Sequence, residues 1–119
     1  MSEVCGRIPF RKLVVDGVSP YDQFCSQLAK DGNLAKQLSG AINIINQVAN
    51  FQRLPSEKFR EITPHGEQIK EYEIKKGDLR FYVIKEDGHI LVFAGKKGSQ
   101  KKDIRRFRLL KESYLQSKP

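Results

Sequence analysis

The sequence predicts an α+β fold with an N-terminal strand, a helical hairpin, a three-stranded antiparallel meander and a C-terminal basic helix. Three observations support this prediction. Apolar residues recur every three or four positions between residues 19 and 49, and the period changes to two between residues 69 and 95, where two Gly/Asp pairs interrupt the pattern. Helical spacing then returns in the last, strongly basic segment.

A short strand and a helix are expected near the start of the chain. Residues 10–15 (FRKLVV) are rich in β-branched side chains and are followed by Asp16-Gly17, which favours a strand that ends in a turn. Ser19 beside Pro20, with Asp22 three residues after the serine, is typical of a helix start, because a hydroxyl caps free amides and an acid stabilises the positive end of the helix dipole. We therefore expect a helix from Pro20.

A second helix is expected soon after the first. Asp31-Gly32-Asn33 interrupts the first helix, and apolar residues from Leu34 to Ala49 then repeat at helical spacing. So short an interruption predicts a hairpin of two helices. Residues 56–66, which include His65, have no clear period and are predicted to form a loop.

The meander has the clearest local pattern in the chain. Strands are expected at residues 69–75, 79–85 and 89–95, because Gly77-Asp78 and Asp87-Gly88 between them are typical of two-residue hairpin turns. Such turns fix the register, and the expected pairs are Lys75 with Arg80, Glu73 with Tyr82, and Val83 with Val92.

The expected register gives the meander two unlike faces. One face is almost wholly apolar and suited to cover by the helical hairpin; its residues are Tyr72, Ile74, Leu79, Phe81, Val83, Ile90, Val92 and Ala94. The other face is half polar; it carries Glu71, Glu73, Lys75, Arg80 and Tyr82 beside Ile84, Leu91 and Phe93.

The C-terminal segment predicts a docked helix with a basic outer surface. Its apolar residues share one helical face and its basic residues fall elsewhere. The apolar set is Ile104, Phe107, Leu110 and Tyr114, and the basic set is Lys102, Arg105, Arg106 and Arg108.

Length and composition indicate one small globular domain, residues 1–119, with its core at about residues 10–115. The chain is 39% hydrophobic, and at 119 residues folding removes roughly 65% of the unfolded surface from water, which excludes a multidomain enzyme. No apolar run approaches the roughly 20 residues that cross a bilayer, and the first residues lack a leader pattern. We therefore expect a cytoplasmic protein with no membrane partner.

Cysteine and histidine are too few and too scattered to predict a metal site. Cys5 and Cys25 do not form a C-x-x-C pair, and His65 and His89 lie far from carboxylate pairs with ligand spacing. The sequence therefore predicts two free thiols, no structural metal and no cofactor.

The positive charge is concentrated at one end of the sequence. Residues 1–95 contain 13 basic and 12 acidic residues, whereas residues 96–119 contain 9 basic and 2 acidic residues. Clustered Lys and Arg favour a polyanion as partner, because neutralised phosphates release condensed counterions. A solvated basic tail is the alternative.

Three short motifs, in a fixed order, carry a resemblance to a known family. They are Tyr72-Glu73-Ile74-Lys75, then Leu79-Arg80-Phe81-Tyr82-Val83, then Ile90 to Lys97 (ILVFAGKK) followed by the basic helix. This order resembles the RelE/ParE toxin superfamily, most closely its HigB-like and phage-derived RelE-like branch, over about residues 51–114. The resemblance implies a RelE-like fold.

The resemblance also implies a function. The protein is expected to be the toxin of a type II toxin–antitoxin system, a ribosome-dependent endoribonuclease that cuts mRNA and so inhibits translation. Its expected partners are a cognate antitoxin protein, the ribosome and mRNA. Such cleavage is metal-independent and uses the 2′-hydroxyl of the RNA as nucleophile, so the protein must supply charge stabilisation and proton transfer.

The expected catalytic residues lie on or beside the polar face of the meander. Arg80 is the first choice for stabilising the transition state, because its guanidinium can bind two phosphate oxygens. Lys96 and Lys97 are expected next to Arg80, one binding phosphate and one donating a proton. Glu73 is the candidate general base, although a cross-strand ion pair with Arg80 or Lys75 is an alternative role.

His65 is a second candidate for the general base. Other residues are expected to bind RNA without taking part in catalysis, and among them Tyr82 is a candidate for stacking on a nucleobase. The expected phosphate contacts are Lys75, Lys101, Lys102, Arg105, Arg106 and Arg108.

Two alternatives to a nuclease remain open. Residues 98–103 (GSQKKD) contain neither the tyrosine nor the histidine that family members often carry after the basic pair. A ParE-like toxin that binds a protein target such as DNA gyrase, and an inactive relative that only binds its antitoxin, are therefore the alternatives.

Overall fold

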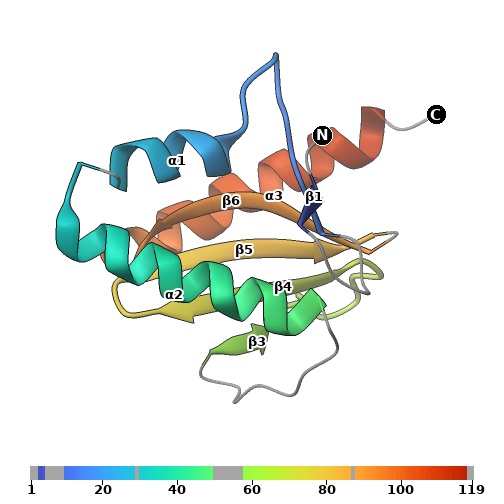
Figure 1. The fold of residues 1–119 in the computed structure, drawn as a ribbon. Helices are drawn as coiled ribbons and strands as arrows, with labels where there is room; N and C mark the ends of the chain where they lie inside the picture. Colours follow the sequence, from blue (N-terminus) through green and yellow to red (C-terminus); the bar gives the residue numbers. More distant parts are fainter. Residues whose placement is uncertain (1–2, 5–9, 29, 50–57, 87, 118–119) are drawn as a thin grey trace.

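A mixed six-stranded sheet lies between two helical layers in the computed structural model (Figure 1), which describes residues 3–4, 10–28, 30–49, 58–86 and 88–117. The elements are β1 (Glu3–Val4), β2 (Phe10–Lys12), α1 (Pro20–Leu28), α2 (Gly32–Ala49), β3 (Phe59–Glu61), β4 (Lys70–Lys76), β5 (Leu79–Lys85), β6 (His89–Lys96), the short 3₁₀ helix η1 (Lys97–Ser99) and α3 (Gln100–Ser117). The strand order is β1-β2-β6-β5-β4-β3, and β2 is parallel to β6 while the other neighbours are antiparallel. The predicted α+β class is confirmed.

The start of α1 follows the predicted local chemistry, and the start of α2 uses a cap that was not predicted. The Asp22 amide donates to Ser19 Oγ at 3.2 Å, so Ser19 caps α1 as expected. Asp31 caps α2 in the same way, because its Oδ1 accepts from the amides of Asn33 and Leu34 at 3.0 and 3.2 Å. The interruption between the two helices is therefore also the start signal of the second.

The N-terminal strand is shorter than predicted. It ends at Lys12, and the chain then forms a tight turn in which the amides and carbonyls of Val15 and Val18 bond to each other. Asp16 and Gly17 have φ angles of 52° and 79°, the positive values that a type I′ turn needs. Asp16-Gly17 therefore makes a separate turn that projects from the sheet (Figure 1).

The sheet has more strands than predicted, because β1 and β3 add an edge strand on each side of the N-terminal strand and the meander. β3 lies inside residues 56–66, which were predicted to be a loop, and it pairs with β4 at the edge of the sheet. β1 pairs with β2 at the opposite edge. Both strands are two or three residues long, too short to show a period in the sequence.

The first meander hairpin has the predicted register. Lys75 pairs with Arg80 and Glu73 pairs with Tyr82, across a two-residue turn whose first residue, Gly77, has a φ angle of 55°. A glycine with positive φ at this position is typical of a type II′ turn, which suits the right-handed twist of paired strands.

The second hairpin departs from the predicted register. Lys85 pairs with His89, so three residues rather than two connect β5 to β6, and Val83 pairs with Leu91 instead of Val92. A β-bulge then restores the predicted pairing of Tyr82 with Phe93.

This slip of one residue exchanges the faces of the first half of β6. Leu91 packs with Phe81 and Val83 in the core beneath α1 and α2. Ile90 and Val92, expected on that side, instead pack with Phe107 in the core beneath α3. The half-polar face is therefore more apolar than predicted, and α3 covers it.

Candidate functional site

The sheet brings four predicted site residues together beneath the first half of α3. The register places Lys75 directly beside Arg80 and Glu73 directly beside Tyr82. Because side chains two positions apart on a strand share a face, all four lie on the face that α3 covers.

Arg80 is held against the turn between β4 and β5. Its Nη1 donates to the carbonyl oxygens of Gly77 and Leu79, both at 2.8 Å. Its Nε is buried without a hydrogen-bond partner, and Nη2 has none among the residues that the structure describes. The guanidinium is therefore fixed at one end and retains donors for an anion.

Glu73 is a fully buried carboxylate with both oxygens occupied. Arg60 Nη2 donates to Oε1 at 3.0 Å, and Gln100 Nε2 donates to Oε2. Arg60 belongs to β3 and Gln100 begins α3, so the carboxylate joins three elements. Neither Arg80 nor Lys75, the partners considered from the sequence, forms its ion pair.

Tyr82 is closed to solvent in this arrangement. Its ring stacks on Phe107 of α3 with centroids 5.5 Å apart, and the side chain is fully buried. Burial raises the pKa of its hydroxyl well above the usual range, and the carboxylates of Glu73 and Asp103 raise it further. The hydroxyl is therefore neutral, and no base of RNA can reach the ring while α3 is in place.

A close approach between β6 and α3 was not foreseen from the sequence. A Cβ atom built on Gly95 would lie 1.9 Å from Oδ2 of Asp103, so any larger residue there displaces this carboxylate. Asp103 is buried and accepts a 2.6 Å hydrogen bond from Ser99 Oγ. The signal in the sequence was the glycine that ends the predicted strand at residues 89–95, because a glycine in a strand often marks close backbone approach.

Lys96, the last residue of β6, and Lys97, the first of η1, lie at the same end of the sheet as Arg80 but in different settings. Arg80 pairs with Gly95, so Lys96 belongs to the opposite face and is exposed, and it does not lie beside Arg80 as expected. The Lys97 ammonium lies 3.2 Å from Oδ1 of Asp78 and lowers the pKa of that carboxyl, with a smaller contribution from Gln37. Lys97 is therefore positioned by the turn that also holds Arg80.

Exposed cations continue from η1 into the first turns of α3. Lys97, Lys101, Lys102 and Arg105 line one shallow hollow together with the backbone of η1. None of Lys101, Lys102, Arg105 and Arg106 forms an ion pair with a described residue. Their charge is therefore available to a polyanion.

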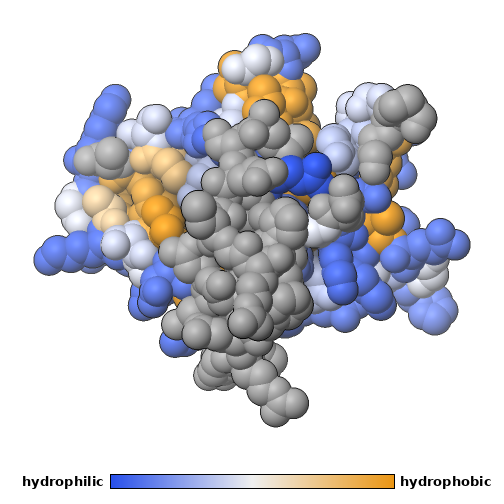
Figure 2. Space-filling view, turned by 45° about the vertical axis from the view of Figure 1, so that its right-hand side comes forward, coloured by the Kyte–Doolittle hydropathy of each residue, from blue (hydrophilic) through white to orange (hydrophobic). Residues whose placement is uncertain are grey.

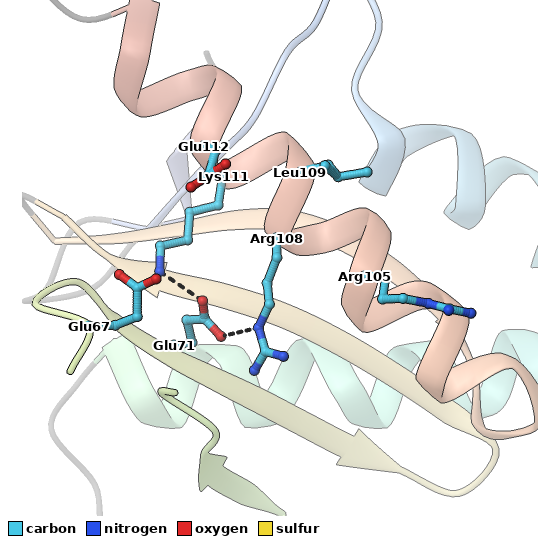
Figure 3. Close-up of a pocket in the computed structure, with 7 residues that line it drawn as sticks. All are labelled: Glu67, Glu71, Arg105, Arg108, Leu109, Lys111 and Glu112. Atoms are coloured by element: carbon cyan, nitrogen blue, oxygen red, sulfur yellow. Dashed lines mark hydrogen bonds and ion pairs between the residues drawn. The ribbon is translucent and has the colours of Figure 1, made fainter. Parts of the chain in front are cut away.

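Arg108 lies apart from these cations. Its Nε donates to Oε1 of Glu71 at 3.0 Å, while Lys111 Nζ donates to Oε2 of the same carboxylate at 2.7 Å. Figure 3 shows both cations reaching from α3 to Glu71 on the sheet, while Arg105 points away from them. Arg108 thus holds α3 to β4, and neither Glu71 nor Lys111 was singled out from the sequence.

The two histidines differ in environment. His65 is exposed in the loop after β3. His89 is buried at the start of β6, where it contacts the rings of Phe59 and Tyr72, and desolvation lowers its pKa to about 4, helped by the nearby charge of Lys85.

In the described part of the chain, no three His, Cys, Asp or Glu side chains gather closely enough to hold a metal ion. No helix in the same residues has the length and apolar character needed to cross a membrane.

Comparison of the chain with protein-family models, with curated proteins and with solved structures found no match. The chain is a compact α+β protein with N-terminal helices and a mixed sheet.

Proposed function

We propose that this protein binds RNA through the basic end formed by the last residues of β6, η1 and the first turns of α3. The observation that supports it best is the group of exposed cations Lys96, Lys97, Lys101, Lys102, Arg105 and Arg106 in one short stretch of chain. The rest of the molecule is nearly neutral, so the positive electrostatic potential is concentrated at this end. A phosphate backbone is the polyanion that such an end suits.

More specifically, we propose a toxin of the RelE/ParE superfamily with a RelE-like fold, nearest the HigB-like branch. The support is the order of the three motifs through Tyr72, Arg80 and Lys97, on a meander that ends in a basic helix. On this proposal the protein works in the cytoplasm, cuts mRNA on the ribosome and is silenced by an antitoxin protein.

The proposed reaction needs no metal. The 2′-oxygen of the RNA forms a bond to phosphorus and loses its proton to a base, while the bond from phosphorus to the 5′-oxygen breaks and that oxygen gains a proton. Arg80 stabilises the extra negative charge on the phosphorane through Nη2, and Lys97, which lies at the same turn, binds phosphate or supplies the proton. Lys96 projects from the opposite face of the sheet, so its part is a more distant phosphate contact.

Glu73 meets a specific obstacle as the base. Both of its oxygens accept hydrogen bonds, one from Arg60 and one from Gln100. It accepts a proton from RNA only after the first turn of α3 has moved and released Gln100. Tyr82 becomes accessible only if α3 also moves at Phe107, about two turns further along the helix, because that ring covers it.

A binding protein without nuclease activity is the second candidate. The observation that favours it is the complete burial of Glu73 and Tyr82 beneath α3. On this view the protein is a ParE-like toxin that binds a protein target such as DNA gyrase, or an inactive relative that binds its antitoxin.

The test is primer-extension mapping of mRNA ends in a reconstituted translation reaction. The unmodified protein is compared with Arg80→Ala and Lys97→Ala, and with Lys36→Ala, which removes an exposed lysine from α2 as a matched control. Each variant is checked for folding by urea denaturation. The nuclease proposal predicts new 5′ ends that need ribosomes, persist in Lys36→Ala and vanish in the other two variants.

Intact mRNA with the unmodified protein contradicts cleavage and leaves RNA binding to be measured separately. Replacing Lys101, Lys102 and Arg105 by Gln should weaken binding to single-stranded RNA about tenfold and lower the slope of log K against log salt by about 2. The triple change of Lys30, Lys36 and Lys58 to Gln, with the same charge loss at exposed positions elsewhere, should leave both values unchanged.

A further inference from the structure

A rigid apolar tip stands beside α3 on the surface. The turn after β2 exposes Val14, Val15 and Val18 by 43%, 38% and 43%, and these three residues are here called the valine turn. Two backbone hydrogen bonds between Val15 and Val18 hold the turn together, so its apolar side chains keep their positions on the surface. Figure 2 shows hydrophobic atoms at the top of the molecule, where this turn projects in Figure 1.

The valine turn forms one wall of a groove along α3. Val15, Val18 and Leu110 line a hollow together with Phe93 and Arg106. Phe93 and Arg106 also line the next hollow toward the start of α3. Val15 and Leu110 line another hollow toward its end.

These three neighbouring hollows, which share lining residues, are together called the α3 groove. Their α3 residues run from Lys102 to Ser117, about 22 Å at 1.5 Å per residue, which is long enough for a peptide segment. Leu109, the most exposed large apolar side chain among the described residues at 68%, lines the hollow nearest the start of α3. Exposed apolar groups in a continuous hollow with a charged rim are typical of a protein-binding surface.

The positive charges beside the groove limit which kind of molecule can bind there. Lys102, Arg105 and Arg106 line the end of the groove near the start of α3, and the whole chain has a net charge of +8. A second copy would bring the same cations together and be repelled. RNA satisfies the cations through its phosphates, but its bases bind best by stacking on flat aromatic rings, and the exposed side chains of this turn are branched aliphatic ones. An acidic segment with bulky apolar side chains can pair its carboxylates with the cations and bury its apolar groups against the valines.

We infer that the α3 groove binds an acidic segment of a partner protein, with apolar side chains between the valine turn and Leu110 and carboxylates on Arg106 and Lys102. This inference deepens the proposed function, because it names the chemistry of a protein partner and the surface that binds it, and it does not depend on nuclease activity. Hydrophobic contact with the valine turn gives affinity, and the cations set which segments are accepted.

The test is selection of peptides from a random library displayed on phage against the full chain, followed by affinity measurement by fluorescence polarisation. The selected peptides are expected to combine Asp or Glu with Leu, Ile or Phe. The double variant Val15→Ser with Val18→Ser, and separately Arg106→Glu, should each weaken their binding at least about tenfold.

The matched control is Ile42→Ser, which removes a similarly exposed apolar side chain from α2, away from the groove. It should leave peptide affinity unchanged. All altered side chains are exposed, so each variant is expected to fold, and urea denaturation checks this.

Five outcomes overturn the inference. Three concern the peptides: no enrichment, enrichment of peptides that lack acidic residues, and affinities that do not respond to the valine changes. The other two are a dimer of this chain that the valine changes dissociate, and binding of single-stranded RNA that depends on Val15 and Val18. The mRNA cleavage assay is a separate readout: the double valine variant should cut as the unmodified protein does, so the two proposals fail independently.

Discussion

Glu71 and Lys111 form a buried ion pair, 2.7 Å from Nζ to Oε2, that ties β4 to α3. The exposed fraction of both residues is at most 3%, and Arg108 adds a second cation to the same carboxylate. A buried charge without its partner is costly, whereas the intact pair compensates much of its own desolvation. The docking of α3 on the half-polar face therefore depends on charge as well as on Phe107.

Glu71→Gln is expected to lower the free energy of unfolding by about 3 kcal/mol, because Lys111 stays buried without a counter-charge. Lys111→Met should cost less, because Arg108 still neutralises Glu71. Urea denaturation measures both. Glu61→Gln, at the exposed pair with Lys70, is the control and should change little; equal effects at Glu71 and Glu61 would contradict the prediction.

Gly95→Ala is expected to destabilise the protein by about 2 kcal/mol, because the new methyl group meets the Asp103 carboxylate. Gly98→Ala is the control, since no atom lies within 4 Å of its added Cβ. In an Asp103→Ala background the cost of Gly95→Ala should fall. A double-mutant cycle by urea denaturation measures that coupling, and a coupling of zero would show that the two residues do not meet.

Tyr82→Phe is expected to raise the free energy of unfolding by about 1 kcal/mol, because the Tyr82 hydroxyl is buried without a hydrogen-bond partner. Thermal and urea unfolding measure the change. Tyr72→Phe, on a half-buried side chain, should have little effect. A clear loss of stability in Tyr82→Phe would mean that the hydroxyl is satisfied.

Stability is expected to fall between pH 6.5 and pH 4 because of His89. Its pKa is lowered to about 4 in the folded protein, so in this window the unfolded chain binds a proton that the folded one does not. The loss should approach about 3 kcal/mol at pH 4, and His89 should contribute nothing above pH 7.

The measurement for His89 is the free energy of unfolding across this pH range. His89→Phe keeps a ring against Phe59 and Tyr72 but cannot titrate, so its profile should be flatter than that of the unmodified protein. His65→Phe, at an exposed loop position, is the control and should keep the full slope. Parallel profiles for His89→Phe and the unmodified protein would contradict the assignment.

The candidate site was only partly predictable. The first hairpin register, and hence the adjacency of Arg80 with Lys75 and of Glu73 with Tyr82, followed from a two-residue turn. The hydrogen-bond partners of Glu73 could not be predicted in this way, because Arg60 lies on a strand of only three residues and Gln100 lies 27 positions away in the sequence. The exposure of Tyr82 depended on where α3 lies, which its own strand does not specify.

Features that depend on neighbouring residues could be predicted: the cap at Ser19, the periods of the helices and strands, the tight turn at Gly77, and the gathering of charge after Gly95. These follow from hydrogen bonds and spacings within a few residues. The parallel pairing of β2 with β6, the one-residue slip in β6 and the burial of Glu71 and Glu73 could be seen only in the folded chain. Such features depend on contacts between distant segments, where a shift of one residue reverses every side chain of a strand.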